Sequence, residues 1–197
     1  MITGSLVMNS IHSPFNLNPF NLVVMGVSGC GKSTVAKELA IELNGHFSDG
    51  DDFHPQANVE RMSKGVALTD SDRIPWLNAI NHYMRQAQPG RSMNVVACSA
   101  LKRIYRDALS DSTRVLFVHL VGDFELIEAR SRAREGHFMN IDLLQSQFDT
   151  LETPDADESV VTINIDAPID EVIRNAVKLV KQSPAYLSFH QNQSASQ

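Results

Sequence analysis

Short apolar runs alternate with segments of helical periodicity along most of the chain. Four of these runs have the length and composition of buried strands: residues 22–27, 95–98, 115–121 and 160–165. A helical pattern follows each of them, beginning near Lys32, Lys102, Phe124 and Pro168. A weaker strand, residues 46–48, follows the first helix. Alternation of strands and helices predicts an α/β fold in which helices cover both faces of a parallel sheet.

Two further helical patterns, about residues 55–64 and 72–88, fall between the weak strand and the strand at 95–98. They add more chain than a simple crossover connection requires. We therefore predict that a helical segment, about residues 53–90, forms a wall of a substrate pocket. In open α/β sheets such a pocket lies beyond the carboxyl ends of the strands.

Both ends of the chain lack this alternation. Residues 1–20 are rich in Asn, Ser and Pro, and residues 183–197 are dominated by Gln, Ser and Asn toward their end. This composition predicts a loose leader and a loose polar tail. Residues 21–182 contain no internal repeat and no linker, so they are interpreted as a single domain.

Composition narrows the classes of function. The 197 residues include 17 Lys and Arg against 23 Asp and Glu, and this net charge of −6 argues against nucleic acid or an anionic membrane as a partner. Two cysteines are too few for a disulfide framework or a zinc site. No apolar stretch approaches the ~20 residues of a membrane span. The first 31 residues lack the Lys or Arg of a secretory or mitochondrial presequence, so a cytoplasmic protein is expected.

One motif carries recognisable chemistry. Residues 26–33 match the pattern GxxxxGK[ST] between an apolar strand and a helix, and this pattern binds nucleoside triphosphates. Its glycines let backbone N–H groups approach phosphate oxygens, and the helix N-terminus adds donors and partial positive charge. Lys32 is expected on the β- and γ-phosphates of ATP, and Ser33 on Mg²⁺. The predicted ATP-binding residues here are Gly26, Val27, Ser28, Gly29, Cys30, Gly31, Lys32, Ser33 and Thr34. The motif alone leaves kinase, ATPase and GTPase open.

Carboxylates cluster just after the weak strand, at Asp49, Asp51 and Asp52. This strand end is expected to face the phosphate-binding loop, so one carboxylate is predicted to orient Mg²⁺. Another is predicted to accept the proton of an attacking hydroxyl. The competing interpretation is a cluster that caps the helix beginning near Pro55. The nearby phosphate-binding loop favours the catalytic interpretation without ranking the three carboxylates.

Several further motifs, taken in order, resemble the gluconokinase family over about residues 22–181. Each piece is weak alone, but the ordered set is specific. The residues that carry the resemblance are Asp49, Gly50, Asp51, His54, Pro55, Asn58, Met62, Gly65, Leu68, Asp70, Asp72, Arg73, Pro75, Trp76 and Leu77, followed by 98–102, 105–107, Gly122, Asp123, Arg130, Arg134, 136–138, Gln147, Phe148, Leu151, Glu152 and Pro154.

The resemblance implies ATP-dependent phosphorylation of D-gluconate at its 6-hydroxyl, which gives 6-phospho-D-gluconate. It also implies the three-layer P-loop kinase fold of the shikimate kinase group, with a five-stranded parallel sheet and a mobile lid. Asp51 becomes the favoured partner of the acceptor hydroxyl, with Asp49 nearer the metal, while Asp52 stays a second candidate for the base. Relatives are often dimers, so the resemblance is compatible with a homodimer. The residues that it places around the sugar acid are His54, Asn58 and Lys102.

A sugar acid needs cations for its carboxylate. Six lie near the predicted site, after the strand at 95–98 or in the helical segment: Lys102, Arg103, Arg106, Arg61, Lys64 and Arg73. Most Lys and Arg side chains are solvated at protein surfaces, so one or two of the six are expected at the substrate. We choose Lys102 and Arg73, partly from the resemblance.

Arg130 and Arg134 lie four residues apart and share a helical face. Two guanidinium groups on one face suit a clamp on nucleotide phosphates, and Gly136 suits the hinge of a lid at about residues 130–145. The competing interpretation is i,i+4 pairing with acids such as Glu128. The predicted catalytic residues are then Lys32, Asp51 and Arg130.

Three smaller expectations concern single features. The acidic loop at residues 155–158 is expected to be solvated, and Trp76 to pack in the core. Cys30 stands at a helix N-terminus beside Lys32, so we hypothesise a lowered thiol pKa and inactivation by alkylation against which MgATP protects. The competing interpretation is a cysteine without any special reactivity.

Two other classes of function remain as alternatives. A shikimate or nucleotide kinase would use the same loop, but the His-Pro and Asn58 motif and the run at 98–102 argue against it. A regulatory or motor NTPase is disfavoured because no NKxD motif is present and the strand at 95–98 ends in Cys98 and Ser99.

Overall fold

The computed structural model describes residues 19–86, 93–132 and 141–194. Within them, five parallel strands form one sheet in the order β2-β3-β1-β4-β5. The strands are β1 (Phe20–Met25), β2 (His46–Asp49), β3 (Met93–Ala97), β4 (Val115–Val121) and β5 (Val160–Asn164). The predicted five-stranded parallel sheet is confirmed. Its central strand β1 is the one that leads into the phosphate-binding motif.

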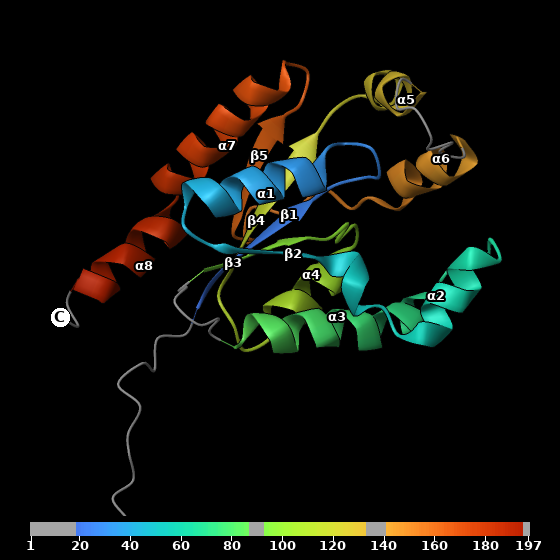
Figure 1. Cartoon of the computed structure of the whole chain (residues 1–197), viewed down its shortest axis with the longest axis horizontal. Coiled ribbons are helices and arrows are strands. Elements are labelled where there is room, and N and C mark those ends of the chain that lie inside the picture. Colours follow the sequence, from blue (N-terminus) through green and yellow to red (C-terminus); the bar gives the residue numbers. More distant parts are fainter. Residues whose placement is uncertain (1–18, 87–92, 133–140, 195–197) are drawn as a thin grey trace, which may run out of the picture.

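Helices cover both faces of this sheet (Figure 1). Helices α1 (Lys32–Glu42) and α7 (Ile169–Gln182) lie on one face, and α3 (Asp70–Met84) and α4 (Arg103–Ser110) lie on the other. Successive β1 side chains point to opposite faces, so Leu22 and Val24 join one core cluster while Val23 and Met25 join the second. This explains why the central strand β1 is largely apolar instead of alternating.

Three further helices and a 3₁₀ turn lie near the carboxyl edge of the sheet, where the phosphate-binding loop also lies (Figure 1). They are the 3₁₀ turn η1 (Gly50–Phe53) and helices α2 (Gln56–Ser63), α5 (Phe124–Arg132) and α6 (Ile141–Thr150). Helix α3 begins with a capping box, in which the Thr69 side chain accepts from the backbone N–H of Asp72 and the Asp72 side chain accepts from the backbone N–H of Thr69. This cap fixes the start of the helix that carries Asp70, Arg73 and Trp76. Among the described helices, none is both long and apolar enough to cross a membrane.

The prediction of a loose polar tail is wrong for Pro184–Ser194, which form helix α8. Phe189 is buried and stacks on Phe20 with ring centroids 5.1 Å apart, and Tyr186 meets the same ring edge-on at 6.0 Å. Burial of these aromatic rings holds the helix in place despite its many polar residues. Phe20, assigned to the leader, is the first residue of β1, whereas residues 1–18 of that leader lie outside the described part of the chain.

Candidate active site

The phosphate-binding loop joins the central strand β1 to helix α1. Gly26 has φ 138°, and a Cβ there would lie 2.8 Å from the carbonyl oxygen of Leu120, so only glycine lets the loop leave β1 this close to β4. Gly31 caps α1 in the left-handed region at φ 97°. No acidic side chain stands in the first turn of α1, so the partial positive charge of its N-terminus is not offset there.

Three contacts of the loop involve side chains. The Lys32 ammonium donates to the Val27 carbonyl at 2.9 Å, and the Ser33 hydroxyl donates to the Asp49 carboxylate at 3.0 Å. The backbone N–H of Ser28 donates to Oε1 of Gln147, on α6, at 2.6 Å. The loop is therefore tied to β2 through Asp49 and to α6 through Gln147.

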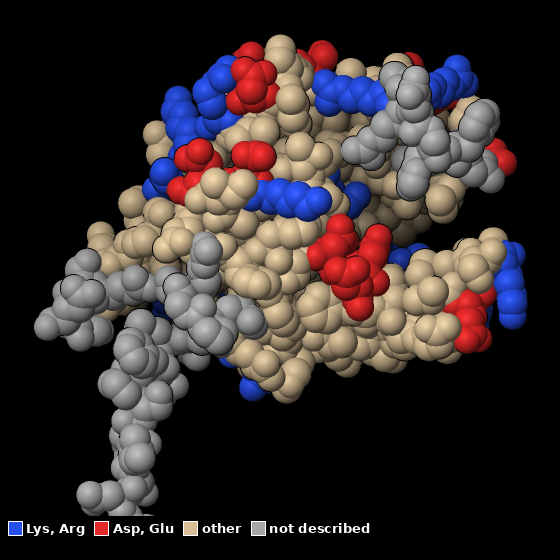
Figure 2. Space-filling model, in the orientation of Figure 1, with Lys and Arg blue, Asp and Glu red and all other residues tan. Residues whose placement is uncertain are grey.

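The acidic turn after β2 combines the two interpretations made from the sequence. One Asp49 oxygen accepts from Ser33, and the other accepts from the backbone N–H of Asp51 at 3.2 Å and so caps η1. Acidic side chains gather over this turn, beside a hollow between α2 and α6 (Figure 2). Burial against the edge of the sheet, together with the neighbouring Asp49 carboxylate, raises the pKa of Asp51. Since the Asp51 side chain is still 87% exposed, water screens part of this effect.

Trp76 supports the turn that carries Asp51. Its indole N–H donates to the Gly50 carbonyl at 2.6 Å, and its ring stacks on His54 with centroids 4.2 Å apart and planes 14° apart. His54 Nε2 lies 4.0 Å from a carboxylate oxygen of Asp51. Burial lowers the pKa of His54, with Arg73 adding to the effect and Asp51 opposing it. Trp76 is buried as expected, and it also positions the groups around Asp51.

Asn58 is buried and ties α2 to α3. Its amide N–H donates to the Asp72 carbonyl at 2.8 Å, and the same nitrogen lies 3.5 Å from Nδ1 of His54. One Asn58 donor is therefore engaged with Asp72. Because the same amide nitrogen also lies beside the His54 ring, Asn58 supports His54.

A cluster of charged side chains joins α3 to α4. Lys102, at the N-terminus of α4, donates to both carboxylate oxygens of Asp70 at 2.9 and 2.8 Å, and the Tyr105 hydroxyl donates to the same carboxylate. These hydrogen bonds hold the pKa of Asp70 below its ordinary value. Arg73 lies over the Tyr105 ring at 5.9 Å and forms no ion pair with the described residues. The two predicted substrate cations, Lys102 and Arg73, are thus neighbours. Lys102 already has a carboxylate partner, whereas Arg73 does not.

Comparison with known proteins identifies the family to which this chain belongs. The sequence model of the shikimate kinase family matches residues 28–154. The thermoresistant gluconokinase of Escherichia coli strain K12 is 44% identical over 162 residues, covering 81% of this chain and 93% of that one. The gluconokinase of Gluconobacter oxydans strain 621H is also 44% identical, over 172 residues and 87% and 97% of the two chains. The chain belongs to the gluconokinase family.

A solved structure supports the same assignment. The crystal structure of a gluconokinase from Sinorhizobium meliloti 1021 superposes with a TM-score of 0.75 at 39% identity, covering 90% of this chain and 97% of that one. Shikimate kinase from Aquifex aeolicus superposes with a TM-score of 0.55 at 14% identity, which supports the fold alone. The sequence-based recognition of the gluconokinase family, within the shikimate kinase-like P-loop kinases, is confirmed.

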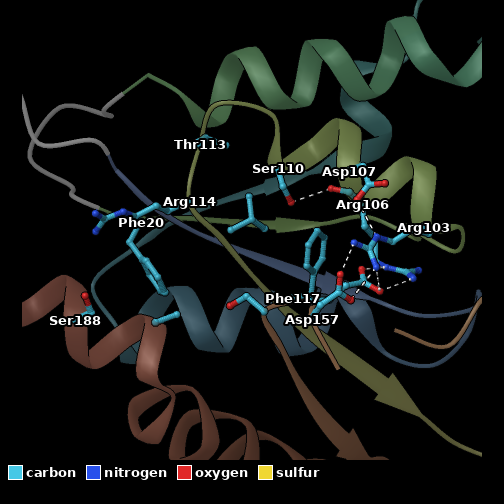
Figure 3. Close-up of a pocket in the computed structure, with 14 residues that line it drawn as sticks. Phe20, Arg103, Arg106, Asp107, Ser110, Thr113, Arg114, Phe117, Asp157 and Ser188 are labelled. Carbon is cyan, nitrogen blue, oxygen red and sulfur yellow. Dashed lines mark hydrogen bonds and ion pairs between the residues drawn. The ribbon is translucent and has the colours of Figure 1, made fainter. Parts of the chain in front are cut away.

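Two of the six cations in this family member are structural. Arg106 is 1% exposed and forms a two-point ion pair with Glu158, with N–O distances of 2.6 and 3.0 Å. Arg103 pairs with Asp107 at 2.9 Å and with Asp157 at 3.0 Å (Figure 3). The prediction of a solvated acidic loop is therefore wrong for Glu158, whose side chain is 6% exposed, because it neutralises a buried guanidinium.

A cavity of about 430 Å³ opens beside this arginine network, as Figure 3 shows. It is lined by Phe20 and Val115, the first residues of β1 and β4, and so lies at the amino ends of the strands. The phosphate-binding loop lies at the opposite edge. Since ligands of open α/β sheets bind at the carboxyl ends, we assign this cavity no part in the reaction.

The predicted arginine clamp falls only partly on described residues. Arg130 donates from its guanidinium to the Ala167 carbonyl, in the segment after β5, at 3.1 Å. The i,i+4 partner of Glu128 is Arg132, at 2.8 Å, so Arg130 does not make the alternative pair considered from the sequence. Arg134 and Gly136 lie outside the described residues, as do all of residues 133–140 of the predicted lid.

The hypothesis of an activated Cys30 is wrong. The thiol is 3% exposed, and burial raises its pKa against the opposing effect of Lys32. Burial likewise raises the pKa of Cys98 to about 12. Desolvation disfavours the thiolate more than one nearby ammonium favours it, so Cys30 packs under the loop as a small apolar residue.

Sequence reasoning assigned no site role to Gln147, Asp70 or Trp76, although all three belong to the motifs that carry the resemblance. Each meets its partner across a long stretch of chain, 119 residues in the case of Gln147 and Ser28. The sequence singled these residues out only as members of the family motifs. Such membership indicates the family, but it does not reveal which residues are in contact.

Proposed function

We propose that this protein transfers the γ-phosphoryl group of ATP to the 6-hydroxyl of D-gluconate and releases ADP and 6-phospho-D-gluconate. The observation that carries this proposal is the link between the phosphate-binding loop and the acidic turn, where Asp49 contacts both Ser33 and the backbone of Asp51. It places a candidate base beside a triphosphate cradle. Relatives named gluconokinase at 44% identity over more than 90% of their own length support gluconate as the acceptor.

On the nucleotide side, we assign ATP to the loop formed by residues 26–34. Lys32 would exchange its bond with the Val27 carbonyl for the β- and γ-phosphates, with Arg130 and Arg134 offsetting charge on the transferring group. Ser33 and Asp49 present a hydroxyl and a carboxylate 3.0 Å apart, and oxygen ligands of this kind fit Mg²⁺, which keeps most of its coordination for phosphate and water. In line with so few protein ligands, no cluster of three or more His, Cys, Asp or Glu suited to a metal occurs in the described ranges. When bound, Mg²⁺ would neutralise developing charge on the phosphates.

On the acceptor side, Asp51 serves as the base. The 6-oxygen of gluconate forms a bond to the γ-phosphorus, the bond from that phosphorus to the bridging oxygen of ADP breaks, and the hydroxyl proton passes to Asp51. The raised pKa of Asp51 suits a proton acceptor better than the pKa of an ordinary aspartate would, and His54 lies 4.0 Å from the Asp51 carboxylate. Arg73 is the cation for the gluconate carboxylate, since it forms no ion pair with a described acid and acts on Asp70 and Asp72 only from a distance. Lys102 and Asp70 then act together as donor and acceptor for the polyol hydroxyls.

The test is a coupled assay of ADP release with gluconate, shikimate, idonate and nucleoside monophosphates as acceptors. We expect gluconate to stimulate turnover strongly. Asp51→Asn should lower kcat by about 10²–10⁴-fold, the usual contribution of a general base, with ATP affinity retained. Asp52→Asn is the matched control and should stay close to the wild type. Absence of stimulation by gluconate would overturn the acceptor assignment, and loss of turnover only in Asp52→Asn would transfer the role of base to that residue.

A further inference from the structure

Gln147 occupies a position that a phosphate oxygen would be expected to take. Ser28 is the third residue of the phosphate-binding motif, and the backbone N–H groups of this motif are the donors that hold phosphates. The Ser28 N–H donates instead to the side-chain oxygen of Gln147, and the 2.6 Å distance is short for an N–H to O hydrogen bond. An amide oxygen carries partial negative charge and accepts in the same manner as a phosphate oxygen.

The backbone that carries Gln147 is firmly packed. Leu144, one turn before it on α6, is 1% exposed, and Phe148 packs edge-on against Phe124 of α5 with centroids 5.5 Å apart. Gln147 also accepts, through its backbone carbonyl, from the N–H of Leu151 at 3.0 Å. The contact with Ser28 is therefore made by a side chain projected from an anchored helix.

The segment that follows this helix contacts the acceptor side. The N–H of Glu152 donates to the Leu101 carbonyl at 2.9 Å, and the Glu152 carboxylate accepts from the backbone N–H of Arg103 at 2.6 Å. These two bonds lie on either side of Lys102 in the chain. Residues 147–152 thus connect an amide of the nucleotide cradle to the turn that presents Lys102.

We infer that Gln147 is an internal competitor for the nucleotide cradle, which ATP displaces from the Ser28 N–H, and that this displacement couples the nucleotide site to the Lys102 turn through residues 147–152. The inference rests on ATP occupying the cradle, as in the proposed function. A hydrogen bond of this kind has a net worth of about 1 kcal/mol, which corresponds to about a fivefold penalty on ATP binding. By reciprocity, the acceptor would also alter the affinity for ATP.

The test is calorimetric titration of the full chain with a non-hydrolysable MgATP analogue, without acceptor. Gln147→Ala should bind the analogue about fivefold more tightly than the wild type, because the competing oxygen is gone. Gln147→Glu should bind it more weakly, since a carboxylate at Ser28 repels the triphosphate. Gln145→Ala is the matched control: this glutamine lies on the same helix, is exposed, and bonds Asp149 at 2.8 Å. It should leave the affinity unchanged.

Unchanged or weaker binding by Gln147→Ala would overturn the inference, because a purely structural glutamine gives no gain in affinity when removed. If Gln147→Ala unfolds at a lower temperature than the wild type, Gln147→Met, which keeps the length of the side chain without the oxygen, takes its place with the same expected gain. Repeating the titrations with saturating gluconate measures the coupling factor, which is the ratio of the analogue affinities with and without gluconate. This factor should approach one in Gln147→Ala. A factor that stays at the wild-type value overturns the coupling between the nucleotide site and the Lys102 turn. The titration without acceptor stands even where gluconate fails as a substrate, so the two proposals fail separately.

Discussion

Replacing Arg106 by methionine removes the cation from a buried ion pair while keeping most of the volume of the side chain. The guanidinium makes five hydrogen bonds, two with Glu158 and three with the carbonyls of Ala100, Leu101 and Glu152. These bonds join the segment after β3 to the loop before β5. Burial alone would raise the pKa of Glu158, but the hydrogen bonds from Arg106 outweigh it and hold that pKa below its ordinary value.

The expected loss of stability follows from what remains after the substitution. Removing one partner of a buried pair costs about 3–5 kcal/mol, because the other charge stays buried without compensation. The carbonyls that lose their donor contribute to the same loss, whereas uptake of a proton by Glu158 limits it. We therefore expect a decrease of about 4 kcal/mol in the free energy of unfolding. With a denaturant slope of about 2 kcal/mol/M, the urea midpoint falls by about 2 M.

Urea unfolding followed by fluorescence and circular dichroism measures this change, with gluconate kinetics on the folded variant. Arg103→Met is the matched control: its close partners Asp107 and Asp157 are 60% and 67% exposed, and its contact with Glu158 is longer, at 3.7 Å, so its midpoint should change much less. The double variant Arg106→Met, Glu158→Gln should regain part of the loss. A wild-type midpoint for Arg106→Met combined with a tenfold rise in the KM for gluconate would refute the reasoning and return Arg106 to the substrate.

Three further predictions concern other buried groups. Trp76→Phe should lower kcat with little change in the KM for ATP, because the Gly50 carbonyl loses its donor and the turn bearing Asp51 is released. The control is Tyr83→Phe, on the same helix α3 as Trp76. It loses the hydroxyl contacts with Ser48 and His46 and should keep its kcat. Burial and the nearby Arg106 lower the pKa of His119. Below about pH 6.5 the unfolded chain therefore binds a proton that the folded chain does not, and the free energy of unfolding should fall as the pH falls. His119→Asn should reduce this pH dependence, measured by urea unfolding between about pH 7 and 5. Cys30 and Cys98 should react with a chromogenic thiol reagent only on unfolding, and rapid modification of the native protein would contradict the raised pKa values and the burial of both thiols.

Most of the fold could be predicted because its determinants are local in the sequence. The strands at residues 95–98 and 115–121 are short apolar runs buried on both faces, and the patterns after them start helices within about two residues of the observed positions. Helix α8 was missed for the opposite reason. Its stability depends on Phe189 and Tyr186 meeting Phe20, a contact between the two ends of the described chain that no local pattern reveals.

In the candidate site, too, local features could be predicted from the sequence, whereas contacts between distant residues could not. The phosphate-binding loop was predicted whole, because eight consecutive residues contain both the backbone geometry and the side chains that it needs. The partners of the cations could not be assigned, because Arg106 meets Glu158 across 52 residues of chain and Lys102 meets Asp70 across 32. Charge alone therefore did not distinguish Arg106, which is neutralised and buried, from Arg73, which has no ion-pair partner among the described residues.

The hydrogen bond between Trp76 and Gly50 closes residues 50–76 into a loop of their own. That stretch contains Asp51 and Arg73 together with their supports, while the phosphate-binding loop belongs to the sheet. Under the proposed function, exchanging residues 50–76, with their contacts to Lys102 and Tyr105 rebuilt, is expected to change the preferred acceptor while ATP binding is retained.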